Sequence, residues 1–280
     1  MTSILTNNGA MVALQTLSTV NNDLTTAQNE ISTGKRVGTA GDNAAVWAIS
    51  KTMESDISGF NAISESLAVG EATVAVASAG AEQIVDKLIE IKELIVSAQS
   101  ENVDHDKIQL DILKKSEQVA AIMASAQFNG VNLLLDTVDG TESSLGVLAS
   151  LDRVGPTGTP AGTEITIDAL DFTNTLDLST MQTISTSTEA ATALVDIEAF
   201  LATAITGAAQ LGSDSARLSD QGEFVSKLTD AMKMGVSSMT DTNMEEASAR
   251  LKALQTQQQL AVQSLSIANG APSSLMTLFR

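Results

Sequence analysis

The chain has 280 residues, a net charge of −19 and no cysteine, and His105 is its one histidine. The absence of cysteine excludes disulfides, thiolate nucleophiles and cysteine-ligated metal sites, and a lone histidine excludes sites that need two. The acidic balance argues against nucleic acid and anionic membranes as partners, because affinity for phosphate comes mainly from Lys and Arg. We therefore expect a protein that is not an enzyme and holds no metal or cofactor.

Aliphatic side chains must supply the core, because 43% of the residues are hydrophobic but only 2% are aromatic. Small aliphatic residues suit the seams between packed helices. We find no apolar run of the roughly 18 residues that a membrane span needs, and the N-terminus lacks the basic region and apolar core of a cleaved secretory signal. Composition alone therefore favours a cytoplasmic protein.

Residues 1–34 are predicted to form an N-terminal axial helix. Residues 1–22 carry no charge, and a seam recurs at steps of three and four residues at Leu14, Leu17, Asn21, Leu24, Gln28 and Ile31. Such a seam is typical of a helix that packs on another helix, and its polar members can fix register and partner. A glycine-rich stretch then predicts a hinge, with Asp42 as the cap of the next helix. We expect Arg36 and Asp42 to form either a solvated pair or a contact between neighbouring subunits.

Residues 35–135 are predicted to form the N-terminal part of a helical bundle. A seven-residue repeat predicts one long helix, with its seam at Phe60, Ile63, Leu67, Gly70, Val74, Ala77, Ala81, Ile84, Leu88, Ile91, Ile95 and Ala98. A shorter helix follows, with Asp104 as its N-cap and Gly130 as its left-handed C-cap. We expect His105, between two aspartates, to be a solvated residue at the start of that helix.

Residues 136–188 are predicted to form a short variable insertion. Between positions 131 and 216, the sequence has twelve acidic residues and a single basic one, Arg153. Two short strands, at 145–148 and 164–167, flank a Gly/Pro loop at 155–160 and predict one β-hairpin. The sequence Thr-Ser-Thr-Glu at 186–189 has the form of a capping box that starts the next helix.

Residues 189–240 are predicted to form the C-terminal part of the bundle, and residues 241–280 a C-terminal axial helix. A second long seam runs through Leu194, Ile197, Leu201, Ala204, Ala208, Leu211, Ser215, Leu218, Gly222, Val225, Thr229, Met232, Val236 and Met239. A new seam out of phase with it begins at Met244 and continues through Ala247, Leu251, Leu254, Gln258, Ala261, Leu265 and Ala268. Residues 242–245 resemble a capping box, and residues 269–272 (Asn-Gly-Ala-Pro) are expected to end the last helix.

The expected fold is mainly α: a long antiparallel helical coiled-coil bundle with a small β-hairpin insertion and hinged terminal helices that pair on assembly. Uncharged, apolar terminal helices are poorly stable alone, so we expect them to become ordered when they pack on other helices during assembly. Head-to-tail contacts between copies of the chain produce a ring or an open helical filament. The candidate assembly seams are Leu14, Leu17, Leu24, Ile31, Leu251, Leu254, Ala261 and Leu265, with junction contacts at Arg36 and Asp42.

Several motifs, in order, resemble those of bacterial flagellin. The N-terminal ones are Ile-Ser-Thr-Gly-Lys-Arg-Val at 31–37, Ala-Gly-Asp-Asn-Ala-Ala at 40–45, Glu-Leu at 93–94 and Phe-Asn-Gly at 128–130. The C-terminal ones are Leu-Gly at 211–212, Arg-Leu at 217–218, Thr-Asp-Thr at 240–242, Ser-Ile-Ala-Asn at 266–269 and Leu-Phe-Arg at 278–280. The resemblance covers about residues 1–135 and 190–280.

This resemblance implies a structural subunit of the flagellar filament, secreted through the flagellar export apparatus with an export chaperone, so the expected location changes from the cytoplasm to the extracellular filament. Its implied partners are itself and the hook-associated and cap proteins. The alternatives are a hook–filament junction protein, which shares the bundle, and a soluble coiled-coil effector. Flagellins detected by the vertebrate innate receptor carry an arginine where this chain has Glu90, so the resemblance implies weak receptor recognition.

Overall fold

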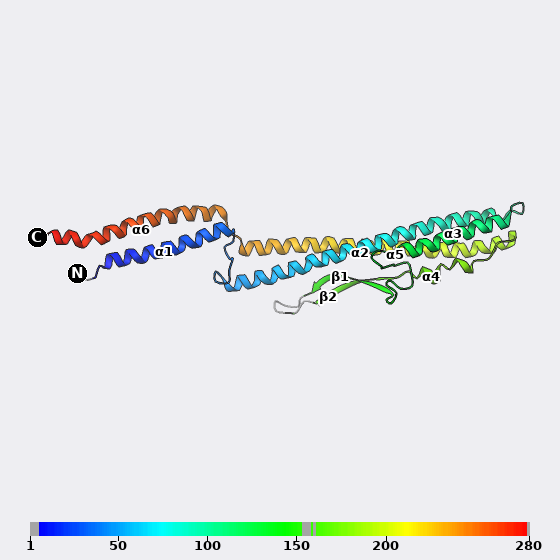
Figure 1. Cartoon of the computed structure of the whole chain (residues 1–280), viewed down its shortest axis with the longest axis horizontal. Coiled ribbons are helices and arrows are strands. Elements are labelled where there is room, and N and C mark those ends of the chain that lie inside the picture. Colours follow the sequence, from blue (N-terminus) through cyan, green and yellow to red (C-terminus); the bar gives the residue numbers. More distant parts are fainter. Residues whose placement is uncertain (1–5, 153–157, 159–160, 279–280) are drawn as a thin grey trace. The chain divides into compact units, whose positions relative to one another are not determined.

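The computed structural model describes residues 6–152, 158 and 161–278, and side chains as far as Gly270. The helices are α1 (Asn8–Thr33), α2 (Ala44–Ser97), α3 (His105–Ser125), α4 (Phe172–Thr175), α5 (Ser187–Thr240) and α6 (Met244–Leu278), with a 3₁₀ turn at Leu178–Thr180. The strands are β1 (Ser144–Asp152) and β2 (Ala161–Asp168). The prediction of a mainly α fold with a β-hairpin is confirmed (Figure 1).

The chain divides into two compact units. Unit 1 contains residues 1–55 and 231–280, and unit 2 contains residues 56–230, so α2 and α5 each contribute to both. In unit 1, α1 and α6 pack side by side (Figure 1). In unit 2, α2 and α5 run antiparallel: Lys92, late in α2, pairs with Glu198, early in α5, at 2.6 Å.

The predicted seams of unit 2 form its core. Every seam residue from Phe60 to Ala98 is buried, and Ile63, Leu88 and Ile95 are fully enclosed. All the predicted seam residues of α5 are buried or half-buried. Ile112 and Val119 of α3 are buried as well. The seven-residue repeat therefore identified the core of unit 2 correctly, because a helix held in a bundle presents the same face every seven residues.

The hairpin packs on unit 2 through glycines of α2. Strands β1 and β2 pair antiparallel, with Val147 opposite Ile165 and a bulge between Leu148 and Ser150. A Cβ atom on Gly70 would lie 2.8 Å from Val147 Cγ2, and one on Gly59 would lie 2.5 Å from Leu151 Cδ1. Only glycine allows this close approach. The predicted hairpin is confirmed with longer strands; its Gly/Pro loop lies outside the described residues except for Gly158.

Two predicted helix ends change. Asp104 caps α3 as expected, accepting from the Lys107 N–H at 3.2 Å, but α3 ends at Ser125. Gly130 is therefore no helix cap: with Asn129 it has positive φ in a tight turn closed by two hydrogen bonds between Phe128 and Val131. Residues 269–272 do not end the last helix, because α6 continues to Leu278.

The cap of α6 is one residue later than predicted. Asn243, and not Thr242, is the cap: its side-chain oxygen accepts from the N–H of Glu245 at 3.1 Å. Asparagine and threonine are both good caps, so the sequence left two neighbouring choices. At α5, Thr186 accepts from the Glu189 N–H at 3.3 Å, which confirms that start.

Helix α5 contains a stretch that is apolar enough to cross a membrane, with a mean hydropathy of 1.4, so the expectation that no such stretch exists was wrong. Length and composition alone give this result. Its seam residues Ile197, Ala204 and Leu211 are fully buried among the side chains of unit 2. These residues form the buried seam of α5, and 28% of the apolar stretch as a whole is buried.

Candidate assembly interface

The pairing of α1 with α6 depends on a small apolar cluster. Val20 and Ala27 of α1 are buried together with Leu254 of α6, and Leu24 and Leu251 pack against them half-buried. The α6 seam matches the predicted one from Ala247 onward, since Ala247, Leu254 and Ala261 are its buried residues, but Met244, its predicted first member, is 45% exposed.

The α1 seam is shifted from the predicted one at alternate positions. Leu17, Leu24 and Ile31 are half-buried as expected, but Leu14, Asn21 and Gln28 are exposed, and Val20 and Ala27 are buried instead. An all-apolar heptad at Ala13, Leu17, Val20, Leu24, Ala27 and Ile31 was present in the sequence as the signal for this face. This heptad was missed because it and the predicted seam share every second residue: Leu17, Leu24 and Ile31. Among the predicted α6 residues, Leu251 and Leu265 are half-buried.

Two side-chain amides connect the helices across this seam. Gln258 donates from Nε2 to Asn21 Oδ1 at 2.7 Å, and Asn7 donates from Nδ2 to the Ala268 carbonyl at 2.7 Å. Polar contacts of this kind specify alignment more than they stabilise, because each exchanges a bond to water for a bond within the protein.

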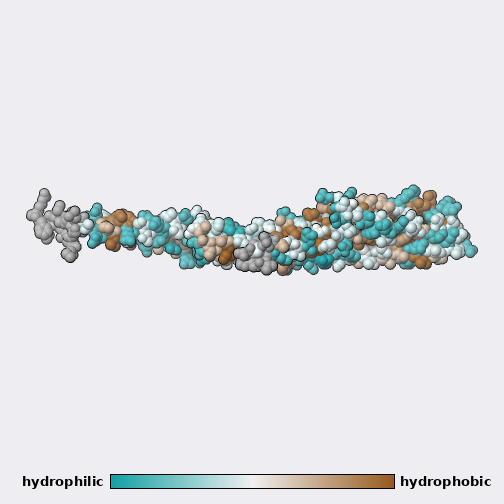
Figure 2. Space-filling model, turned by 90° about the horizontal axis from the view of Figure 1, so that it is seen from below, coloured by the Kyte–Doolittle hydropathy of each residue, from teal (hydrophilic) through white to brown (hydrophobic). Residues whose placement is uncertain are grey.

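Unit 1 also presents large apolar side chains that contact little within the chain. Figure 2 shows apolar patches interspersed with polar surface on the face that it displays. Six such side chains lie on α1 and α6, each more than half exposed: Met11 66%, Val12 63%, Leu14 61%, Leu260 60%, Val262 51% and Ile267 68%. We call these six residues the terminal apolar face. All six lie in stretches without any charged residue.

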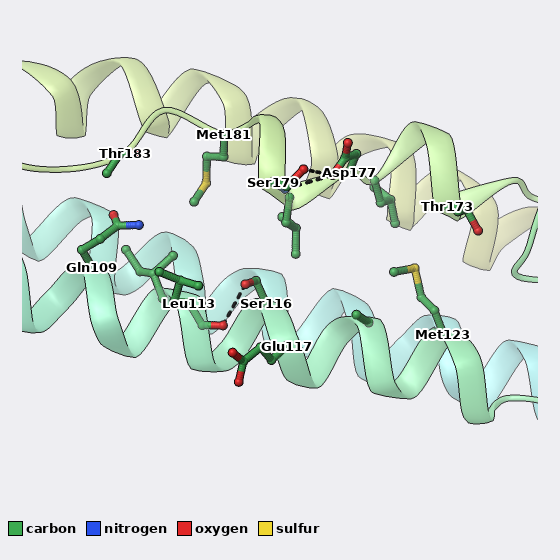
Figure 3. Close-up of a pocket in the computed structure, with 14 residues that line it drawn as sticks. Gln109, Leu113, Ser116, Glu117, Met123, Thr173, Asp177, Ser179, Met181 and Thr183 are labelled. Carbon is green, nitrogen blue, oxygen red and sulfur yellow. Dashed lines mark hydrogen bonds between the residues drawn. The ribbon is translucent and has the colours of Figure 1, made fainter.

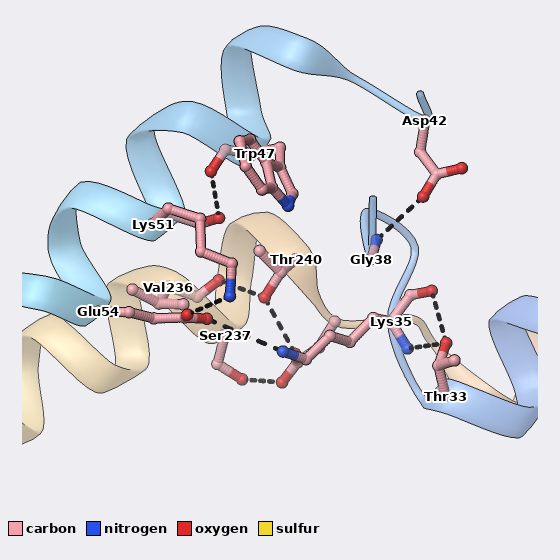
Figure 4. A network of polar contacts seen from close by, with 12 residues as sticks. Thr33, Lys35, Gly38, Asp42, Trp47, Lys51, Glu54, Val236, Ser237 and Thr240 are labelled. Atoms are coloured by element: carbon pink, nitrogen blue, oxygen red, sulfur yellow. Dashed lines mark hydrogen bonds and ion pairs between the residues drawn. The ribbon is translucent and has the colours of Figure 1, made fainter. Parts of the chain in front are cut away.

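Backbone hydrogen bonds hold the linker after α1 against the end of α5 (Figure 4). Gly34 ends α1 in the left-handed conformation at φ 69°, which favours glycine. The Thr240 carbonyl accepts from the N–H of Arg36 at 2.7 Å, and the Gly34 carbonyl accepts from the N–H of Thr242 at 2.9 Å. Lys51, 2.6 Å from Glu54, lowers the pKa of that carboxyl mainly through a hydrogen bond.

Arg36 and Asp42 have different partners within the chain. The Arg36 guanidinium donates to the Met239 carbonyl at 3.1 Å, whereas Asp42 accepts from the N–H of Thr39 at 2.8 Å and of Gly38 at 3.1 Å. The hydrogen bond from the Thr39 N–H is the main reason that the pKa of Asp42 is lowered. Asp42 therefore closes the linker loop.

The sequence predicted that Asp42 caps α2, but Asp42 is not the cap. The next residue, Asn43, caps α2 by accepting from the Val46 N–H at 3.1 Å. Asp42 Oδ2 instead accepts from the N–H groups of Gly38 and Thr39.

Unit 2 contains a pocket of about 540 Å³ between α3 and residues 173–183 (Figure 3). Half of its lining residues are aliphatic or methionine: Ile112, Leu113, Ala120, Met123, Leu176, Leu178 and Met181. Its two carboxylates make local contacts, Glu117 with Lys114 at 2.9 Å and Asp177 with the Ser179 hydroxyl at 2.6 Å. None of the lining residues is a histidine, and apolar and polar side chains contribute equally to the lining.

Glu90 is engaged by two lysines of unit 2. Lys115 of α3 and Lys87 of α2 both donate to its carboxylate, Lys87 at 2.8 Å. The hydrogen bond from Lys115, followed by that from Lys87, lowers the pKa of Glu90 to about 2. His105, expected to be solvated, is half-buried, with Nε2 2.9 Å from the Ala98 carbonyl near the end of α2.

The comparisons with known proteins agree on one family. The model of the bacterial flagellin N-terminal helical region matches residues 4–139, and that of the C-terminal helical region matches residues 194–279. Flagellin FljO of Caulobacter vibrioides is 37% identical over 100% of this chain and 99% of its own length. A flagellin of Brucella melitensis is 38% identical over the whole of both chains.

Among solved structures, the crystal structure of Bacillus cereus flagellin aligns with 56% of this chain and 86% of that chain, at 16% identity and a TM-score of 0.48. The two flagellin models together match most of the chain, and the relatives span its full length. The chain therefore belongs to the bacterial flagellin family and is a structural subunit of the extracellular flagellar filament.

Proposed function

We propose that the terminal apolar face is where copies of this chain contact one another in the filament. The observation that carries this proposal is the exposure of six large apolar side chains in two uncharged helical stretches. Burying each would contribute about 1.5–3 kcal/mol. The absence of charge matters too, because like charges brought together in a dry interior repel strongly.

The predicted segments acquire separate roles under this proposal. Residues 1–34 and 241–280 are the axial helices, residues 35–135 and 189–240 form the bundle, and residues 136–188 are the variable insertion. The seam residues Leu17, Leu24, Ile31, Leu251, Leu254, Ala261 and Leu265 hold α1 to α6, and Leu14 faces the neighbouring subunit. Arg36 and Asp42 form hydrogen bonds within their own chain, to Met239 and Gly38. These bonds favour a role in holding the linker conformation over a direct contact with a neighbouring subunit.

Seeded elongation of the purified chain tests the interface. Leu14→Asn and Ile267→Asn should each raise the critical concentration about tenfold or more, since each replaces an apolar contact by a polar group. The matched control is Thr16→Asn, an exposed and already polar position of α1, and it should leave the critical concentration nearly unchanged. Unaltered elongation of both apolar variants, with unit 2 still folded by circular dichroism, would contradict the proposal.

We also infer that the chain passes through the flagellar export apparatus with an export chaperone and meets the hook-associated and cap proteins at the filament ends. The support is family membership and a sequence without cysteine, in which no disulfide can form before export. A strain with a blocked export channel should retain the protein inside the cell. Its appearance in the medium of that strain would contradict this route.

For the innate receptor, we infer weak activation. At the position where receptor-detected flagellins carry an arginine, Glu90 supplies a carboxylate engaged by Lys87 and Lys115. Glu90→Arg should increase the reporter-cell response to the monomer, whereas Glu90→Gln, which removes the charge without adding a base, should increase it less. Full potency of the unmodified chain would contradict the inference.

A further inference from the structure

A proline inside α6 leaves one carbonyl without its usual partner. Helix α6 runs from Met244 to Leu278 and therefore includes Pro272. Proline has no N–H, so it cannot donate to the carbonyl four residues earlier. The carbonyl concerned is that of Ala268.

Asn7 donates to this carbonyl from the other helix. Asn7 Nδ2 lies 2.7 Å from the Ala268 oxygen, and Asn7 Oδ1 accepts from the N–H of Ala10 at 3.1 Å as the N-cap of α1. Gly9 also lies beside Ala268, since a Cβ atom there would lie 3.9 Å from that of Ala268, an ordinary van der Waals distance. One side-chain amide thus caps α1 and supplies the donor that Pro272 cannot.

We propose that Asn7 is a positioning residue that clasps the free end of the α1–α6 pair, and that Pro272 keeps its acceptor available. The other end of the pair is closed by the bond from the Thr242 N–H to the Gly34 carbonyl. The two closures are 27 residues apart along α1 and 26 along α6, so they hold matching lengths of helix.

The clasp matters because the apolar contacts of the pair lie elsewhere. Its buried cluster, at Val20, Ala27 and Leu254, lies towards the middle of the pair, whereas Met11 and Ile267 beside the clasp are exposed. Near the free end, the clasp fixes the stagger of α1 against α6 and therefore where their exposed apolar residues lie along the pair. This step rests on the proposed role of the terminal apolar face.

A double-mutant cycle between Asn7 and Pro272 tests the clasp. Asn7→Ser keeps an oxygen for the cap but removes the amide donor. Amide hydrogen exchange of residues 8–14 and 260–268 should accelerate about fivefold in this variant, the effect of one lost hydrogen bond. In the Pro272→Ala background, residue 272 supplies an N–H to Ala268, and the same Asn7→Ser change should accelerate exchange less than twofold.

Asn21→Ser is the matched control. It removes the amide contact to Gln258, which has no link to Pro272, so its effect should be the same in both backgrounds. Exchange is measured on the full chain before assembly and in filaments, and coupling of Asn7 to Pro272 in either state supports the clasp. The clasp would be overturned if, in both states, Asn7→Ser had the same effect in the two backgrounds or had no effect at all. If the wild-type chain formed no filaments, the proposed function would fail, while the cycle on unassembled protein would still decide the clasp.

Discussion

Unit 1 and unit 2 have seams with the same seven-residue spacing, but they bury them to different degrees. In α2, every seam residue from Phe60 to Ala98 is buried, whereas in α1 only Val20 and Ala27 are. Within unit 2, α3 and the hairpin pack on the long helix α2, whereas in unit 1 α1 and α6 pack on each other. Periodicity therefore shows which face of a helix packs, and the number of neighbours decides whether that packing is complete within one chain.

The sharpest way to break this comparison is to remove one leucine of the predicted seam from each unit. Leu88→Ala, at a site with 0% exposure, should lower the free energy of unfolding of the unassembled chain by about 3 kcal/mol through lost burial and a cavity. Leu14→Ala, at 61% exposure, should change it by less than about 0.5 kcal/mol. Urea unfolding followed by circular dichroism measures both. Similar losses for the two variants would show that unit 1 is as complete as unit 2.

A pair of glycines tests whether the hairpin belongs to the closed core of unit 2. Gly70→Ala should lower stability by about 1–2 kcal/mol, because the new methyl meets both Cγ atoms of Val147 and overpacking exceeds the gain in helix propensity. Gly212→Ala, in α5 with no atom within 4 Å of its Cβ position, should instead stabilise by up to about 1 kcal/mol. Thermal unfolding of unassembled chains distinguishes them.

The Gly70→Ala loss should be relieved by Val147→Ala in the double variant, since the smaller side chain removes the clash. If Gly70→Ala stabilised the chain as much as Gly212→Ala, the hairpin would not be packed on α2 as described.

The smallest expected effect is a pH dependence that arises at Glu90. Its pKa is lowered to about 2 by Lys115 and Lys87, so its stabilising contribution is fully present above the unfolded value near 4.5 and is lost as the pH falls from there towards 2. Glu90→Gln should flatten the slope of unfolding free energy against pH in that window. Glu117→Gln, which removes a more exposed carboxylate on the same unit, should flatten it less. Equal slopes for wild type and Glu90→Gln would contradict this.

Short-range patterns predicted much of the structure. The long helices, their seams, the cap at Asp104 and the paired strands follow from repeats and residue types that act within a few turns of chain. Where two neighbouring residues could serve equally, as at Asp42 and Asn43 or at Thr242 and Asn243, local chemistry could not choose, and the contacts of the linker decided.

The sequence by itself determined the family, the mainly α fold and the uncharged character of both ends, because each is written in residue type and spacing. Only the tertiary structure decided which α1 seam is buried, since two overlapping heptads share Leu17, Leu24 and Ile31 and only the position of α6 separates them. It also decided that α6 continues through Pro272, and it brings Asn7, 261 residues away along the chain, within 2.7 Å of the Ala268 carbonyl. No sequence pattern near Ala268 indicates that Asn7 is its donor.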